Sequence, residues 1–151
     1  MFRKLILIVL TVIALPSCAV HAPVAAQDAP DLGTRAAAVA LEQLGVPYRY
    51  GGRSPTGFDC SGLVQYAYGL AGKSLPRTTG ELWETTASVK GGALRPGDLV
   101  FFQIDGKMSH VGLYLGKDNF VHAPSTGRVV SIESLDSPFY SNAFIRGGRP
   151  Q

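Results

Sequence analysis

The order of hydrophobic patterns along the chain restricts its fold more than any other feature. Before Gly91-Gly92 the apolar residues recur at helical spacing, whereas after Pro96-Gly97-Asp98 they form short β-rich runs separated by turn residues. A parallel sheet needs helices and strands that alternate, because each pair of parallel strands requires a crossover connection. Helices first and strands second therefore predict an α+β fold, with N-terminal helices packed on a C-terminal antiparallel β-sheet of about five to six strands.

Capping and turn residues divide this pattern into elements. Helices are expected over residues 31–44, with Asp31 or Thr34 at the start, from about 59 or 60 to 70, with Gly72 at the end, and in a short stretch opened by the capping box of Thr78 and Glu81. A loop rich in Gly, Pro and Tyr covers 46–58. The expected strands are 99–103, 109–115, 120–123, 129–134 and 143–146.

The N-terminal segment has the pattern of an export signal. Arg3 and Lys4 precede an apolar run of about 11 residues, roughly 16 Å as a helix and too short for a hydrocarbon core of about 30 Å. The run ends in Leu15-Pro16-Ser17-Cys18, which resembles the lipobox of bacterial lipoproteins. We therefore expect a lipoprotein signal peptide at 1–17 and lipidation of Cys18. The alternative is an ordinary signal peptide cleaved at a small residue, with Cys18 incidental.

An Ala- and Pro-rich stretch separates this segment from the folded domain. Residues 18–30 are expected to form a lipidated, extended tether of about 35 Å that holds a domain at 31–151 near its membrane. By analogy with lipoprotein sorting, this would be the outer membrane facing the periplasm, or otherwise the outer face of the cell membrane. Loss of residues 1–17 removes two cations and lowers the formal charge from +3 to +1, which gives no support to a nucleic-acid partner. A targeting or regulatory protein is possible but unidentified.

One cysteine and two histidines are the candidates for chemistry within 31–151. Cys60 lies where a helix is expected to begin, and unpaired amides and the helix dipole there favour a thiolate. His110 and His122 lie on neighbouring expected strands, whose spacing allows two side chains of one face to meet. A nucleophilic thiol needs a base, and that base needs an orienting partner. A buried structural cysteine and two structural histidines are the alternative.

The ordered motifs resemble the NlpC-type cell-wall endopeptidases, a family of small papain-like cysteine peptidases of bacteria. The segments that carry the resemblance are 48–52 (YRYGG), 59–64 (DCSGLV), 75–78 (LPRT), 96–102 (PGDLVFF), 109–114 (SHVGLY) and 122–123 (HA). The resemblance implies that Cys60 is the nucleophile, His110 the general base and acid, and His122 the residue that orients it. It also implies that the Tyr48 hydroxyl helps to stabilise the oxyanion.

Three further positions are implied to contact substrate. Asp59 and Ser61 match family positions that, in some members, hold the free amine of the substrate, although Asp59 is also a good helix N-cap. Arg77 matches a basic position that faces stem-peptide carboxylates, or is a solvated surface residue.

The implied activity is hydrolysis of an amide bond in murein stem peptides, without a cofactor or metal. The bond is the D-isoglutamyl–diamino acid bond or the D-alanyl crosslink. The alternatives are a noncatalytic murein-binding lipoprotein, an acyl transferase on the same fold, and a zinc site built from the cysteine and the two histidines.

Overall fold

The computed structural model describes residues 29–151, and the signal-peptide and lipidation predictions lie outside this range. The helices are α1 (Leu32–Leu41), α2 (Cys60–Ala71), α3 (Thr79–Thr85) and α4 (Pro138–Ala143), with a 3-10 turn at Gly91–Ala93. The strands are β1 (Arg53–Ser54), β2 (Gly57–Phe58), β3 (Ala87–Val89), β4 (Leu99–Ile104), β5 (Lys107–Gly116), β6 (Asn119–His122), β7 (Ser131–Ser134) and β8 (Phe144–Arg149).

The capping residues start the first three helices where predicted, although α1 ends at Leu41 rather than at residue 44. The Asp31 carboxylate accepts a hydrogen bond from the Thr34 amide at 2.7 Å at the start of α1. Thr78 and Glu81 form the expected capping box of α3. Helix α2 ends at Gly72, whose φ of 107° is in the left-handed region that glycine adopts without strain. Local side-chain chemistry therefore fixes these boundaries.

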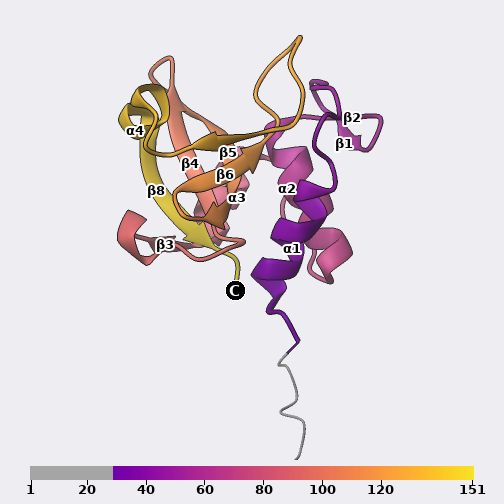
Figure 1. Ribbon diagram of the computed structural model, residues 1–151, viewed down its shortest axis with the longest axis horizontal. Coiled ribbons are helices and arrows are strands. Elements are labelled where there is room, and N and C mark those ends of the chain that lie inside the picture. The colour runs from indigo at the N-terminus through magenta and orange to yellow at the C-terminus, as the bar shows by residue number, and fades with distance from the viewer. Residues whose placement is uncertain (1–28) are drawn as a thin grey trace, which may run out of the picture.

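The strands form one six-stranded antiparallel sheet in the order β3-β8-β4-β5-β6-β7. Helices α1 and α2 lie side by side against one face of this sheet, and α4 lies on the far side of it (Figure 1). The predicted α+β fold and its antiparallel sheet are thus confirmed.

Four short elements were not predicted from the sequence. Strands β1 and β2 form a two-residue hairpin inside the expected loop, and β3 adds an edge strand next to β8. Helix α4 includes Ala143, where a strand was expected, and Val129 forms only an isolated bridge to Pro47. Elements of two to six residues carry too few periodic positions to be identified from a pattern.

The sheet separates two hydrophobic clusters. Alternate residues of β4 point to opposite faces, so that Leu99 and Phe101 pack beneath the helices while Val100 and Phe102 join a smaller cluster on the other face. That smaller cluster is covered in part by Tyr140 of α4. Among the helices within residues 29–151, none has the length and apolar character needed to cross a membrane.

Candidate active site

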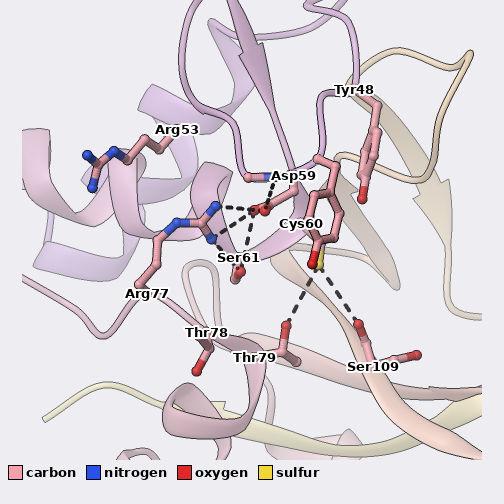
Figure 2. A pocket seen from close by; sticks show the side chains of 11 residues that line it. Tyr48, Arg53, Asp59, Cys60, Ser61, Arg77, Thr78, Thr79 and Ser109 are labelled. Atoms are coloured by element: carbon pink, nitrogen blue, oxygen red, sulfur yellow. Dashed lines mark hydrogen bonds and ion pairs between the residues drawn. The ribbon is translucent and has the colours of Figure 1, made fainter.

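A pocket of about 560 Å³ opens at the N-terminal end of α2 (Figure 2). Its walls come from the loop before α2, the first residues of α2, the start of α3 and strand β5. The residues that line it are Tyr48, Tyr50, Gly51, Arg53, Asp59, Cys60, Ser61, Arg77, Thr78, Thr79 and Ser109. Segments distant in sequence thus converge on the first turn of one helix.

Cys60 is the first residue of α2, and its thiol faces strand β5 and helix α3. The sulfur lies 3.7 Å from Thr79 Oγ1 and donates to the Ser109 carbonyl oxygen at 4.0 Å (Figure 2). Among the described residues it is the free cysteine, and it is partly buried. The thiol is therefore held beside the strand that carries His110, the residue that follows Ser109.

Burial raises the pKa of the Cys60 thiol above its ordinary value. Hydrogen bonds from the Thr79 hydroxyl and from the amides of Val111 and Ser61 act in the opposite direction, and the charge of Asp59 adds to the rise. The sequence predicted that the helix start would favour the thiolate. In the structure the loss of solvation outweighs the helix amides, so the resting group is the neutral thiol.

His110 and His122 form the contact expected of them. His110 Nε2 and His122 Nδ1 are 2.7 Å apart, and both rings are buried. Phe120 of β6 pairs with Tyr114 of β5, and period-two alternation from these positions places both imidazoles on one face. Phe102, Phe120 and Tyr140 surround the rings. An aromatic cage therefore fixes the pair.

The pair is neutral at pH 7. Burial lowers the pKa of His110 to about 4 and that of His122 to about 3. One shared proton then links the two rings. If it lies on His110 Nε2, then His110 Nδ1 is free to accept a proton and His122 carries its own proton on Nε2. That Nε2 atom is buried and has no hydrogen-bond partner within residues 29–151.

The thiol and the imidazole pair form no hydrogen bond with each other among the described residues. Within the part of the chain that the structure describes, the sulfur's partners are the Thr79 hydroxyl and the backbone of Ser109, Val111 and Ser61, and neither imidazole is among them. Cys60 lines the pocket at α2, whereas His110 lines a second cavity.

Asp59 is the most heavily bonded side chain of the pocket. Its carboxylate accepts from the amides of Gly62 (2.7 Å) and Gly51 (3.0 Å), and so caps α2 and holds the preceding loop. Arg77 adds a two-pronged ion pair, with Nη1 at 2.9 Å from Oδ1 and Nη2 at 2.7 Å from Oδ2, and also donates to Ser61 Oγ at 2.9 Å. Asp59 is therefore already neutralised by a guanidinium.

Tyr48 faces the same pocket as Cys60 (Figure 2). Burial raises the pKa of its hydroxyl, and the charges of Cys60 and Asp59 raise it further. The hydroxyl thus keeps its proton and can act as a hydrogen-bond donor.

Sequence reasoning missed three lining residues. Thr79 and Ser109 bond the sulfur, and Arg53 brings a second cation to the pocket. Ser109 could have been found from the sequence, because it precedes His110 in an expected strand. No sequence pattern pointed to Thr79 or Arg53. No group of three or more His, Cys, Asp or Glu side chains within 29–151 is arranged to hold a metal ion, so the zinc alternative has no ligand set there.

A thiol at the start of a helix that packs on an antiparallel sheet defines this domain as papain-like. The model of the NlpC/P60 family matches residues 45–149, which is most of the described chain. The chain belongs to the NlpC/P60 family. The predicted family and its papain-like α+β fold are thereby confirmed.

The chain is similar to several curated proteins over almost three quarters of its length. It is 42% identical to murein DD-endopeptidase MepH of Escherichia coli (strain K12) over 115 residues, 72% of this chain and 42% of that protein. It is 43% identical to the probable endopeptidase p60 of Listeria monocytogenes serovar 1/2a over 112 residues, 74% of this chain and 23% of that protein. The chain thus spans less than half the length of these relatives.

Solved structures show the same fold. The NlpC/p60 domain of the peptidoglycan hydrolase SagA superimposes with a TM-score of 0.67 at 30% identity, covering 77% of this chain and 97% of that one. A lipoprotein-like NLP/P60 family protein from Staphylococcus aureus gives a TM-score of 0.70 at 34% identity, covering 78% of this chain and 41% of that one. The alignment thus covers almost the whole of that NlpC/p60 domain.

Proposed function

We propose that this protein is a murein endopeptidase, a cysteine peptidase that hydrolyses an amide bond in peptidoglycan stem peptides. One observation carries the proposal: the Cys60 thiol lies at the start of α2, in an open pocket, beside the strand that carries the buried His110–His122 pair. The relatives named as murein or peptidoglycan hydrolases support the substrate class.

In the first half of the reaction Cys60 becomes acylated. His110 Nδ1 takes the thiol proton as the sulfur attacks the carbonyl carbon of the scissile amide, and the carbonyl π electrons move to oxygen. His122 holds the Nε2 proton of His110 and so keeps Nδ1 available. When the tetrahedral intermediate collapses, the C–N bond breaks and His110 gives its proton to the leaving amine. A thioester to Cys60 remains.

In the second half water releases the acyl group. His110 takes a proton from water as its oxygen attacks the thioester carbon, and the C–S bond then breaks to give a carboxylic acid. Cys60 recovers its proton from His110. The Cys60 amide, which is unpaired at the first position of α2, and the Tyr48 hydroxyl donate to the oxyanion in both halves.

The pocket at α2 receives the acyl side of the substrate. Asp59 and Ser61 hold Arg77, and with Arg53 the pocket carries two cations against one carboxylate. We assign Arg77 to a carboxylate of the stem peptide, with Asp59 and Ser61 acting through it. A free substrate amine would have to compete with the Arg77 guanidinium for Asp59, so stems with an acylated N-terminus suit this pocket better.

The location follows from the substrate. Peptidoglycan lies outside the cytoplasm, so the protein is exported, and the lipidation proposed for Cys18 would anchor it at a membrane through the 18–30 tether. Lipoproteins carry several acyl chains, which gives stable anchoring. The scissile bond is the D-isoglutamyl–diamino acid bond or the D-alanyl crosslink, and the murein DD-endopeptidase among the relatives favours the crosslink.

Mass spectrometry of muropeptides and sacculi incubated with the purified protein tests this proposal. We expect cleavage by the wild type and none by a Cys60→Ala variant that keeps its circular dichroism spectrum, with product masses that identify the bond. An active Cys60→Ala variant would contradict the mechanism. Products whose masses show an acyl group joined to an amine would point to transfer, and binding of sacculi without cleavage would point to a murein-binding role.

A further inference from the structure

Helix α3 carries the hydroxyl that contacts the Cys60 sulfur. Thr79 is the first residue of this helix, and its Oγ1 atom lies 3.7 Å from the sulfur. A helix of seven residues is not stable by itself, and Leu82 is the one side chain of α3 that is fully buried. The position of the Thr79 hydroxyl therefore depends on what anchors the rest of α3.

Arg146 of strand β8 anchors α3 through Trp83. Its Nη2 atom donates a hydrogen bond to the Trp83 carbonyl oxygen, and its guanidinium carbon lies 3.8 Å from the centre of the Trp83 ring. Among the aromatic side chains, tryptophan binds a cation best. Trp83 follows Thr79 by four residues, so the two side chains lie on the same face of α3. One arginine thus holds this face through two different contacts.

Arg146 is not engaged by a carboxylate. Within residues 29–151 the ion pairs join Arg77 to Asp59, Arg128 to Glu133 and Arg149 to Asp98. Burial lowers the pKa of Arg146, which is the effect of placing a cation among rings and carbonyl groups without an anion. The contacts with Trp83 are therefore the main link between this guanidinium and another element of the fold.

The anchor and the thiol are connected along one row of the sheet. Arg146 pairs with Phe101 of β4, and Phe101 pairs with Val111 of β5. The Trp83 ring packs edge-on against Phe101, with ring centres 5.3 Å apart. The Val111 amide bonds to the Cys60 sulfur. The row that supports Trp83 therefore ends at the strand that faces the thiol.

A glycine on β8 lets the other end of α3 come equally close to the sheet. Thr86 is the C-cap of α3, and a Cβ atom at Gly148 would overlap with Thr86 Oγ1 and lie 2.6 Å from a ring carbon of Phe101. Gly148 is two residues after Arg146 and lies on the same face of β8. Two neighbouring positions of one strand thus set where α3 lies.

Resting on the proposed function, in which Cys60 is the nucleophile, we propose that Arg146 is a positioning residue for the thiol and acts on it through Trp83 and Thr79. The guanidinium holds α3 on β8, and α3 holds the Thr79 hydroxyl at the sulfur. The hydroxyl then donates a hydrogen bond to the thiolate as it forms. Through this route, loss of Arg146 removes at most what the Thr79 contact supplies.

The rate at which iodoacetamide alkylates Cys60, followed by mass spectrometry of the Cys60 peptide, tests this role without a substrate. We expect Arg146→Met, which keeps an apolar stem, to slow alkylation at pH 8 by about two- to threefold and to move the rate–pH profile to higher pH. Arg146→Lys, which keeps a cation over the ring, should recover part of the rate. In a Thr79→Val background Arg146→Met should have no further effect, because the hydroxyl through which it acts is gone.

Arg149→Met is the matched control. It removes a guanidinium from the same strand, but one that bonds to Asp98 and to the Ala93 carbonyl oxygen instead of to α3. It should lower the free energy of unfolding in urea and leave the alkylation rate at the wild-type value. Trp83→Phe keeps a ring on Phe101 and weakens the cation–π contact, so it should slow alkylation even if Arg146→Met does not fold.

Three results would overturn the positioning role. They are an unchanged or faster alkylation rate in both Arg146→Met and Trp83→Phe, equal slowing in Arg149→Met, and further slowing by Arg146→Met in the Thr79→Val background. Failure of the wild type to cleave murein, with the alkylation rates as expected, overturns the proposed function instead.

Discussion

The two cavities that border β5 are held in place by different forces. At the start of α2 the side chains are fixed by polar bonds, with Asp59 at the centre of two amides and a guanidinium. Around His110 and His122 the polar contact is a single hydrogen bond of 2.7 Å, and the packing of aromatic rings holds the two imidazoles in place. One side is a hydrogen-bonded network, and the other is a packed cage.

This difference matches the groups that each side must hold. A pocket fixed by polar bonds keeps charge at its surface, where Arg77 and Arg53 can meet substrate. A packed cage removes water and keeps the imidazoles neutral, because the charged form loses its solvation there. Stability and reactivity should therefore respond differently to substitution on the two sides.

Of the residues that position the proposed catalytic groups, His122 should matter most for activity, because nothing else bonds to His110 Nε2 within the described chain. We expect His122→Ala to lower kcat by about 100- to 1,000-fold, the range for removal of a positioned acid–base function. His122→Asn or His122→Gln should recover at least tenfold, since an amide oxygen can accept the Nε2 proton. Steady-state rates measure this, and equal losses for Ala, Asn and Gln would rule out an orienting role.

Loss of Asp59 should affect stability most on the other side. We expect Asp59→Ala to lower the free energy of unfolding by about 2–4 kcal/mol, because it removes an N-cap and leaves Arg77 without its anion. Asp59→Asn can still cap α2 and should lose less. Urea denaturation measures the free energy of unfolding of each variant. As a control, Asp31→Ala removes only the exposed cap of α1 and should lower the free energy of unfolding by about 1 kcal/mol. Equal losses of stability in Asp31→Ala and Asp59→Ala would show that the bonds of Asp59 beyond its helix cap do not stabilise the fold.

The pH dependence of activity and of stability should show the effect of burying the two imidazoles in the aromatic cage. With the pKa of His110 near 4 rather than 6.5, the base stays neutral as the pH falls, so the acid limb of kcat/KM should lie well below pH 6.5. The unfolded chain takes up these protons near pH 6.5 and the folded one near 4. The free energy of unfolding therefore falls as the pH drops through this window. A pH–rate profile and urea curves at pH 7 and 4.5 check both, and an acid limb at or above 6.5 would count against a buried pair.

The smallest effect is expected when the Thr79 hydroxyl, which contacts the thiol, is removed. The Thr79 hydroxyl lowers the Cys60 pKa against the rise caused by burial. Thr79→Val keeps the shape of the side chain and loses that bond, so alkylation of Cys60 by iodoacetamide at pH 8 should slow by about threefold. Thr79→Ser should react like the wild type, and an unchanged rate in Thr79→Val would show that the 3.7 Å contact does not act on the sulfur.

Interactions between near neighbours in the chain account for the elements that could be predicted from the sequence. The caps at Asp31, Asp59 and Thr78 act over three residues, and the left-handed Gly72 ends α2 through its own backbone. The order of helical and β patterns then selected the antiparallel sheet, and Cys60 was recognisable because it lies at one of these helix starts.

Features that depend on residues far apart in the sequence could not be predicted, because they arise from the packing of the fold. Arg77 meets Asp59 across 18 residues, and burial beneath β5 reverses the expected effect of the helix start on the Cys60 thiol. The separation of Cys60 and His110 into two cavities likewise appears in no local pattern. Desolvation and long-range pairing depend on how the helices pack against the sheet, and a single sequence records only the local preferences that precede this packing.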